Sequence, residues 1–157
     1  MTCCEIEAGG ERLALLPERA VWWARRDSLI VADLHLGKGS DFQAAGVPVP
    51  TGDDRRDLNR LSRLIAEAGA RRLILLGDLF HGKSAAEERL RREFESWRRS
   101  HEALALDFVR GNHDRYLDSI PPGWRMTERE EDWRCDSLVF AHHPDPAVPP
   151  EGQFRVA

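Results

Sequence analysis

Short apolar runs separated by polar turns recur along the whole chain. Residues 11–18 and 20–26 have the length of two short strands joined by a turn, and the adjacent Trp22 and Trp23 then point to opposite faces. The run SLIVAD at 28–33 is apolar almost throughout and ends in an acid, which is typical of a strand buried on both faces. The pattern therefore predicts three strands before the first helix.

Helical and strand patterns alternate in the middle of the chain. Residues 51–68 are helical by period, and Gly69 suits the end of that helix. RRLILLGD at 71–78 predicts a second buried strand, and Ser84 is a candidate cap for a second helix. The apolar positions that define the two helical faces are Leu58, Leu61, Leu64, Ile65 and Ala68 in the first and Leu90, Phe94 and Trp97 in the second.

A third buried strand and its polar loop are expected within residues 103–114. The later segments 124–128, 133–135, 137–143 and 153–157 have strand patterns with little helix between them. Three strand–loop–helix units followed by strands predict an α/β protein with a mixed sheet. In such folds the ligand site lies beyond the carboxyl ends of the strands.

Composition sets the broad class of the protein. A chain of 157 residues, 41% hydrophobic and 32% charged, has the size and composition of one globular domain. No run approaches the roughly 20 apolar residues that cross a membrane, and no basic and apolar leader is visible, so we expect a cytoplasmic protein without a membrane partner. The net charge of −4 gives no argument for nucleic-acid binding. The three cysteines form no CxxC pair and predict reduced thiols.

Metal-competent side chains follow four of the predicted strands. Residues at i and i+2 of an extended backbone project to the same side, which predicts that one ion can be shared by the first pair. Carboxylate, imidazole and amide oxygen suit manganese, iron or zinc, and two ions about 3.5–4 Å apart would activate water for attack on a phosphate ester. The four clusters are Asp33-Leu34-His35, Gly77-Asp78, Gly111-Asn112-His113-Asp114 and Ala141-His142-His143.

Each cluster also has an ordinary structural interpretation. Asp33 and His35 fit a turn beside a surface residue, and Gly77-Asp78 fits a common loop. The cluster at 142–143 is equally well a polar cap on a strand. The cluster at 111–114 is harder to explain as a turn, and every cluster follows an apolar strand-like run. His101 follows a helical pattern instead, so we expect no catalytic part for it.

Together these motifs resemble the calcineurin-like metallophosphoesterase superfamily, whose signature runs D-x-H, G-D, G-N-H-D/E, H and G-H-x-H. The resemblance covers the chain from about residue 11 onward. VADLHLGK, LGDLFH, VRGNHD, LPERAVWW and GVPVP are most similar to the small bacterial members associated with DNA ligase and helicase genes in the DNA-damage response. GDLFH also resembles the branch of double-strand-break repair exonucleases. The resemblance implies a four-layer α/β/β/α sandwich and one domain over residues 1–157.

The resemblance also implies a set of metal ligands. Asp33, His35 and Asp78 would hold one divalent ion, with Asp78 bridging to a second ion held by Asn112 and His142. Manganese is the expected metal, with iron or zinc as alternatives.

Catalytic and substrate-binding roles follow in the same way. His113 would protonate the leaving oxygen or stabilise the transition state, and Asp114 would orient its imidazole. His81 matches a second catalytic histidine of the repair-nuclease branch. Arg110 and Lys38 are the candidates for contacts with phosphate.

One motif of the superfamily is absent. The chain ends at FRVA, where the superfamily continues into G-H-x-H, so the domain is expected to be C-terminally incomplete and to lack its last strands. A truncated sequence, ligands lent by a neighbouring chain and loss of catalysis all remain open, and the intact upstream set favours the first.

The function expected from these motifs is a metal-dependent phosphodiesterase, a DNA endonuclease in DNA-damage repair that uses a hydroxide activated by two metals. Ligase and helicase repair proteins would be its partners. The alternatives are a small-nucleotide phosphodiesterase or phosphatase, and a non-catalytic metal- or phosphate-binding module.

Overall fold

A seven-stranded sheet forms the centre of the computed structural model, which describes residues 3–48, 53–81, 88–143 and 152–157. Its strands lie in chain order, and a second, three-stranded sheet has the order β10-β9-β8. The strands of the larger sheet are β1 (Cys4–Ala8), β2 (Glu11–Leu16), β3 (Ala20–Trp23), β4 (Ser28–Ala32), β5 (Arg72–Leu76), β6 (Ala105–Val109) and β7 (Thr127–Arg129). The strands of the smaller sheet are β8 (Trp133–Cys135), β9 (Leu138–Phe140) and β10 (Phe154–Val156).

The direction of pairing changes halfway across the larger sheet. Strands β1 to β4 pair antiparallel, whereas β4, β5, β6 and β7 run parallel to one another. The helices are α1 (Lys38–Ala44), α2 (Asp53–Ala68) and α3 (Glu88–Ser100), with 3-10 turns η1 (Ala24–Arg26), η3 (His113–Tyr116) and η4 (Pro122–Trp124). The long connections through α1, α2 and α3 allow the parallel strands to return to the same edge.

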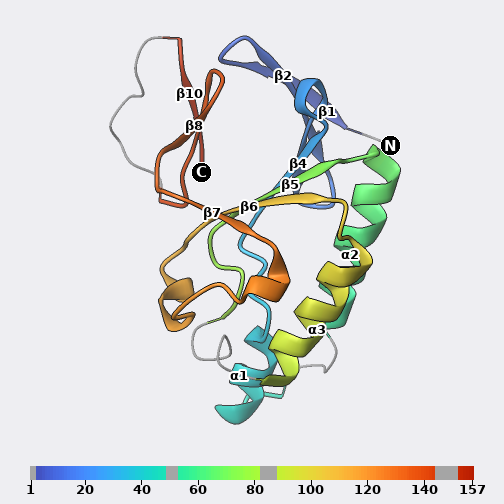
Figure 1. The fold of residues 1–157 in the computed structure, drawn as a ribbon, viewed down its shortest axis with the longest axis vertical. Coiled ribbons are helices and arrows are strands. Elements are labelled where there is room, and N and C mark those ends of the chain that lie inside the picture. The colour runs from blue at the N-terminus through green and yellow to red at the C-terminus, as the bar shows by residue number, and fades with distance from the viewer. Residues whose placement is uncertain (1–2, 49–52, 82–87, 144–151) are drawn as a thin grey trace.

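Helices α2 and α3 lie side by side on one face of the larger sheet (Figure 1). Their apolar faces pack onto inward-facing residues of β4, β5 and β6 in one continuous core. Trp97 of α3 donates a hydrogen bond from its indole to the Ser62 hydroxyl of α2 at 2.9 Å. The helix-face residues Leu58, Leu61, Leu64, Ile65, Leu90, Phe94 and Trp97 are buried, as their periodicity predicts. Ala68, the last predicted position of the first face, is only partly buried.

The smaller sheet covers the opposite face and creates a second core. Trp23 and Phe140 meet there with ring centroids 6.0 Å apart. Trp22 packs on the helix side instead, so the two tryptophans do point to opposite faces. This core also contains Ile30, Ile74, Leu76, Val109 and Leu138.

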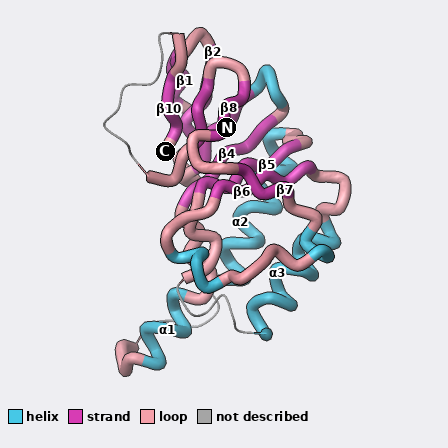
Figure 2. The backbone as a smooth tube through the Cα atoms, turned by 60° about the vertical axis from the view of Figure 1, so that its left-hand side comes forward, coloured by secondary structure: helices cyan, strands magenta, loops and turns pink. Residues whose placement is uncertain are grey.

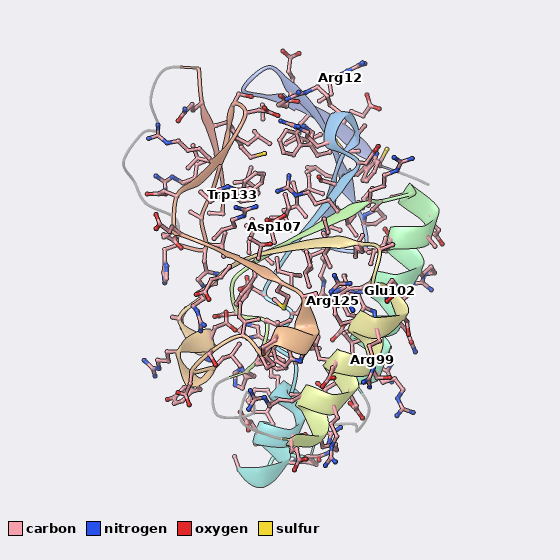
Figure 3. All side chains as sticks on the ribbon, viewed as in Figure 1. Arg12, Arg99, Glu102, Asp107, Arg125 and Trp133 are labelled. Carbon is pink, nitrogen blue, oxygen red and sulfur yellow. The ribbon has the colours of Figure 1, made fainter. Side chains whose placement is uncertain are left out.

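A buried acid lies between the two sheets. The Asp107 carboxylate on β6 accepts hydrogen bonds from Arg72 of β5 and Arg129 of β7, both at 2.6 Å. Both guanidinium groups also lie within 5.0 Å of the Trp133 ring centroid on β8. Figure 3 labels Asp107 and Trp133 of this cluster. The cluster connects three strands of the larger sheet to the smaller one.

The fold agrees with the expected class, an α/β sandwich with two stacked sheets. The described residues contain one helical layer, and the second helical layer of a four-layer sandwich is not among them. Thr51 and Ser84 fall outside the described residues, so the predicted start of α2 and the cap of α3 are not described. Strand β1 and helix α1 were not predicted. Figures 1 and 2 place α1 at the end of the molecule remote from the β1–β2 hairpin.

None of the helices within the described ranges is long and apolar enough to cross a membrane. All three cysteines, Cys3, Cys4 and Cys135, are unpaired, as predicted.

Candidate metal centre

The carboxyl ends of β4, β5 and β6 meet at one edge of the larger sheet. The loop after β4 pairs with the loop after β5, because the His35 amide donates to the Asp78 carbonyl at 2.8 Å. Leu36 and Phe80 then form a parallel bridge. The Gly77 amide donates to the Val109 carbonyl at 2.8 Å, which brings the loop after β6 alongside. The parallel topology therefore brings together three loops that are far apart in sequence.

Asp33, His35 and Asp78 form a tight group of ligand atoms. One donor atom from each lies within 4.8 Å of the others. The imidazole Nε2 of His35 is 3.8 Å from a carboxylate oxygen of Asp78. The three residues converge as predicted, but the reason given for the first pair, an extended backbone, is wrong. Asp33 and His35 have φ of 52° and 49°, and these left-handed conformations turn both side chains toward Asp78.

A second group forms on the other side of Asp78. The Nε2 atom of His142, which follows β9, lies 3.2 Å from the Asn112 amide oxygen and 3.7 Å from the second Asp78 carboxylate oxygen. Its Nδ1 atom is 3.9 Å from Asp33. Asp78 thus has one oxygen toward His35 and the other toward His142, an arrangement suited to a carboxylate that bridges two cations.

Two glycines make room for this arrangement. A Cβ atom at Gly77 would lie 1.9 Å from the His142 ring, and one at Gly111 would lie 2.2 Å from an Asp78 carboxylate oxygen. Both distances are far below van der Waals contact. Gly77 also has φ of 66°, which L-residues rarely adopt.

Three imidazoles form the rim of the centre next to α1. The rings of His81 and His113 are stacked with centroids 4.9 Å apart, and His35 meets both edge-on. Burial lowers the pKa of His35 and of His81 below the ordinary value of 6.5. The shift favours the neutral form of both rings, in which a ring nitrogen can act as a ligand or as a base.

Asp114 holds the loop that carries His113. Its fully buried carboxylate accepts hydrogen bonds from the amides of Gly111 at 2.8 Å and Phe80 at 3.3 Å. Burial raises the pKa of Asp114, and those amide donors oppose the shift. The hydrogen bonds of Asp114 go to the backbone of two loops, so its influence on His113 is exerted through the loop conformation.

The two cations predicted to contact phosphate lie in different settings. The Arg110 guanidinium pairs with Glu128 and donates to the carbonyls of Asp114 and Leu117 at 3.0 and 2.8 Å. These bonds place Arg110 behind the loop after β6. Lys38 lies beside the centre, with its ammonium 5.9 Å from the Phe42 ring centroid. Contact of either residue with phosphate remains a prediction.

The structure adds one residue that the motifs did not indicate. A carboxylate oxygen of Glu131 accepts the backbone amides of both His142 and His143 at 3.0 Å. His143 is exposed, with Nδ1 3.6 Å from Glu131 and no place in the ligand group. Glu131 stands among several acids between β7 and β8, and nothing in that pattern distinguishes it.

The donor set fits divalent cations. The side chain of Asp78 is only 6% exposed, and the basic side chains nearest to it within the described ranges are histidines, not lysine or arginine. A buried carboxylate without a cationic partner is costly unless a bound cation neutralises it. Two carboxylates, two imidazoles and one amide oxygen are ligands that manganese, iron and zinc accept.

Fold and site together define a metallophosphoesterase, and comparison with protein families agrees. The model of the calcineurin-like phosphoesterase family matches residues 28–152. The chain belongs to this family and is a hydrolase.

A solved structure extends the comparison. The chain is similar to the nuclease MPE of Pseudomonas putida, with 33% sequence identity and a TM-score of 0.82 over 93% of this chain and 68% of that one. Comparison with curated proteins gave no match.

Proposed function

We propose that the protein is a DNA endonuclease that hydrolyses phosphodiester bonds with two divalent cations. Manganese is the proposed metal, with iron or zinc as alternatives. The observation that carries the proposal is the position of Asp78, whose two carboxylate oxygens face the two ligand groups on either side. The similarity to a nuclease supports the substrate class.

The ligand groups divide between the two cations. Asp33 and His35 would hold one cation, Asn112 and His142 the other, and Asp78 would contact both. Bound divalent cations supply an activated water and neutralise the charge that develops on phosphate. The chain supplies the rest of the chemistry.

His113 is the proposed proton donor to the leaving oxygen. Its amide donates to Asp78 at 2.9 Å, so the residue is anchored to the centre. Its ring is stacked on His81, which restricts its orientation. His81 is proposed as a second catalytic histidine. Its Nδ1 atom lies 3.5 Å from the Nδ1 atom of His35.

The biological setting is proposed from sequence resemblance. The motifs around the metal ligands are most similar to metallophosphoesterases associated with repair ligases and helicases. A role in DNA-damage repair, with such proteins as partners and a cytoplasmic location, is the matching proposal.

Cleavage of circular single-stranded DNA with and without manganese tests the proposal, because a circle offers no end to an exonuclease. We expect manganese-dependent linearisation that His113→Ala abolishes while manganese binding is retained. Hydrolysis of bis(p-nitrophenyl) phosphate without DNA cleavage would point to a small-nucleotide phosphodiesterase. Manganese binding without turnover of either substrate would point to a non-catalytic module.

A further inference from the structure

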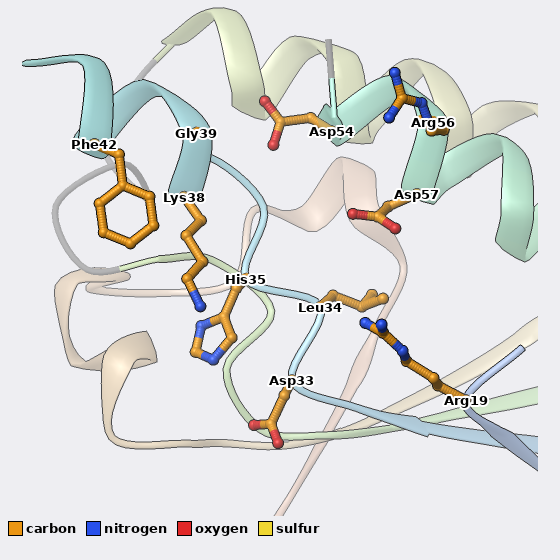
Figure 4. Close-up of a pocket in the computed structure, with 10 residues that line it drawn as sticks. All are labelled: Arg19, Asp33, Leu34, His35, Lys38, Gly39, Phe42, Asp54, Arg56 and Asp57. Atoms are coloured by element: carbon orange, nitrogen blue, oxygen red, sulfur yellow. The ribbon is translucent and has the colours of Figure 1, made fainter. Parts of the chain in front are cut away.

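A pocket of about 450 Å³ opens beside the metal centre, between α1, the start of α2 and the turn before β3 (Figure 4). Asp33 and His35 line its inner end, so it is continuous with the proposed reaction site. Arg19, Lys38 and Phe42 line the same pocket, and the Lys38 side chain points toward His35 (Figure 4).

Basic and acidic side chains in the pocket differ in what they already contact. Asp54 accepts the Gly37 amide at 2.6 Å and pairs with Arg89 at 3.5 Å. Asp57 pairs with Arg60 at 3.5 Å. The carboxylates on this side are thus engaged by other parts of the chain.

Arg19 and Lys38 differ from these acids. Among the described residues, no carboxylate lies within ion-pair distance of either side chain, although both line the pocket. Two cations that no carboxylate of the described ranges neutralises, beside a phosphoesterase centre, are suited to an anionic ligand.

Phe42 supplies an apolar surface to the same pocket. Its side chain is exposed on a short helix, with 40% of the residue accessible. The ring centroid is 6.2 Å from that of His81, whose ring is stacked on His113. An exposed aromatic ring with a lysine beside it suits the base and phosphate of a nucleotide.

We propose that this pocket is a binding subsite for the nucleotide next to the scissile phosphate, with Lys38 and Arg19 on its backbone phosphate and Phe42 stacked on its base. The proposal rests on the nuclease function and specifies how the substrate strand is held. Because a base in a duplex is covered on both faces, the subsite takes an unpaired nucleotide.

Binding of a fluorescein-labelled oligothymidylate, measured by anisotropy at several salt concentrations with calcium in place of manganese, separates the two contacts. Lys38→Ala and Arg19→Ala should each weaken binding, and the double variant should reduce the slope of log Kd against log salt by about 0.7, the value for one phosphate contact on a single strand. Phe42→Ala should raise Kd on the order of 10-fold with an unchanged slope. Phe42→Trp should restore binding.

An oligomer of abasic sites provides the decisive comparison. It keeps the phosphates, so Phe42→Ala should bind it as tightly as the wild type does, whereas Lys38→Ala should still lose affinity. Phe154→Ala, at an exposed ring on β10, and Arg71→Ala, at the amino end of β5, are matched controls outside the pocket.

The outcomes distinguish this proposal from the proposed function. If the wild type cleaves circular DNA but the pocket variants bind oligothymidylate like the controls, the subsite is refuted and the nuclease stands. An equal loss for Phe42→Ala on the abasic oligomer would refute base stacking. If the wild type neither binds nor cleaves DNA, both proposals fail.

Discussion

Gly77→Ala is expected to remove His142 from the metal centre while the fold is retained. Ordinary contact with a Cβ atom begins at about 3.4 Å, and the new methyl group would lie 1.9 Å from Nδ1 of His142. The ring must therefore retreat by the difference, about 1.5 Å. That shift displaces the Nε2 atom of His142, which now lies 3.2 Å from the Asn112 amide oxygen and 3.7 Å from an Asp78 carboxylate oxygen. The loss of one ligand should weaken manganese binding by at least 10- to 100-fold.

A matched glycine separates the clash from backbone strain. Gly69, after α2, has φ of 65°, almost the same as the 66° of Gly77, but a Cβ atom there would meet nothing within 4 Å. Alanine in a left-handed conformation costs about 1–2 kcal/mol at either position. Each kcal/mol corresponds to about 2–4 °C in the melting temperature of a domain of this size. Gly69→Ala should show this destabilisation with unchanged manganese affinity.

Calorimetric titration with manganese and thermal unfolding followed by circular dichroism supply the two measurements. We expect both variants to lose similar stability and Gly77→Ala alone to lose manganese affinity. Two bound ions with wild-type affinity in Gly77→Ala would refute the view that this glycine determines the position of His142. Equal loss of affinity in Gly69→Ala would show that general strain, not the clash, is responsible.

Three further predictions concern residues around the centre and the sheets. Glu131→Ala should weaken manganese binding about 10-fold, because the amides after β9 lose their shared acceptor. Glu131→Gln keeps an acceptor oxygen and is the control. Equal loss of manganese affinity in both variants would contradict this role. Asp107→Ala should lower the free energy of unfolding, measured in urea, by about 2–3 kcal/mol, since two partly buried arginines lose their counter-charge. Glu102→Ala, which removes an exposed ion pair with Arg125, should lower it by less than about 1 kcal/mol. Similar losses would refute the importance of the buried cluster. The hydrogen bond from Arg25 lowers the pKa of Glu11 from 4.5 in the folded state, so the stability linked to Glu11 is complete above that value and lost as pH falls through the lower pKa. Acid unfolding of Glu11→Gln should lack this component, and an unchanged pH profile would contradict the assignment.

Most of the larger sheet could be predicted because burial on both faces leaves a plain pattern. Strands β4, β5 and β6 are apolar almost without interruption, and α2 and α3 repeat apolar residues at helical spacing. Strand β1 was missed because CEIEA is short and contains two acids among its five residues, with only Ala8 buried. Helix α1 was missed because KGSDFQA has no apolar period and begins where Asp54 binds the Gly37 amide.

The ligand types at the strand ends were also predictable, but their geometry was not. Asp33 and His35 converge through left-handed backbone, which no spacing rule indicates. The role of Glu131 depends on the packing of the smaller sheet, and the pocket around Phe42 depends on α1 and the turn at Arg19 facing the same space. These contacts join segments that are far apart in the sequence, and nothing in the sequence indicates that they lie close together.

The position of His142 has a consequence for how the protein folds. The first ligand group lies on loops of the larger sheet alone, whereas His142 arrives with the smaller sheet, which must dock before the second group exists. Contacts so distant in sequence form late, because loop closure has to precede them. An intermediate with the smaller sheet undocked would hold one cation weakly, and the second cation would bind only the docked state. Manganese should therefore stabilise the packing of the two sheets, by an amount that grows as its concentration rises above the Kd of the second position.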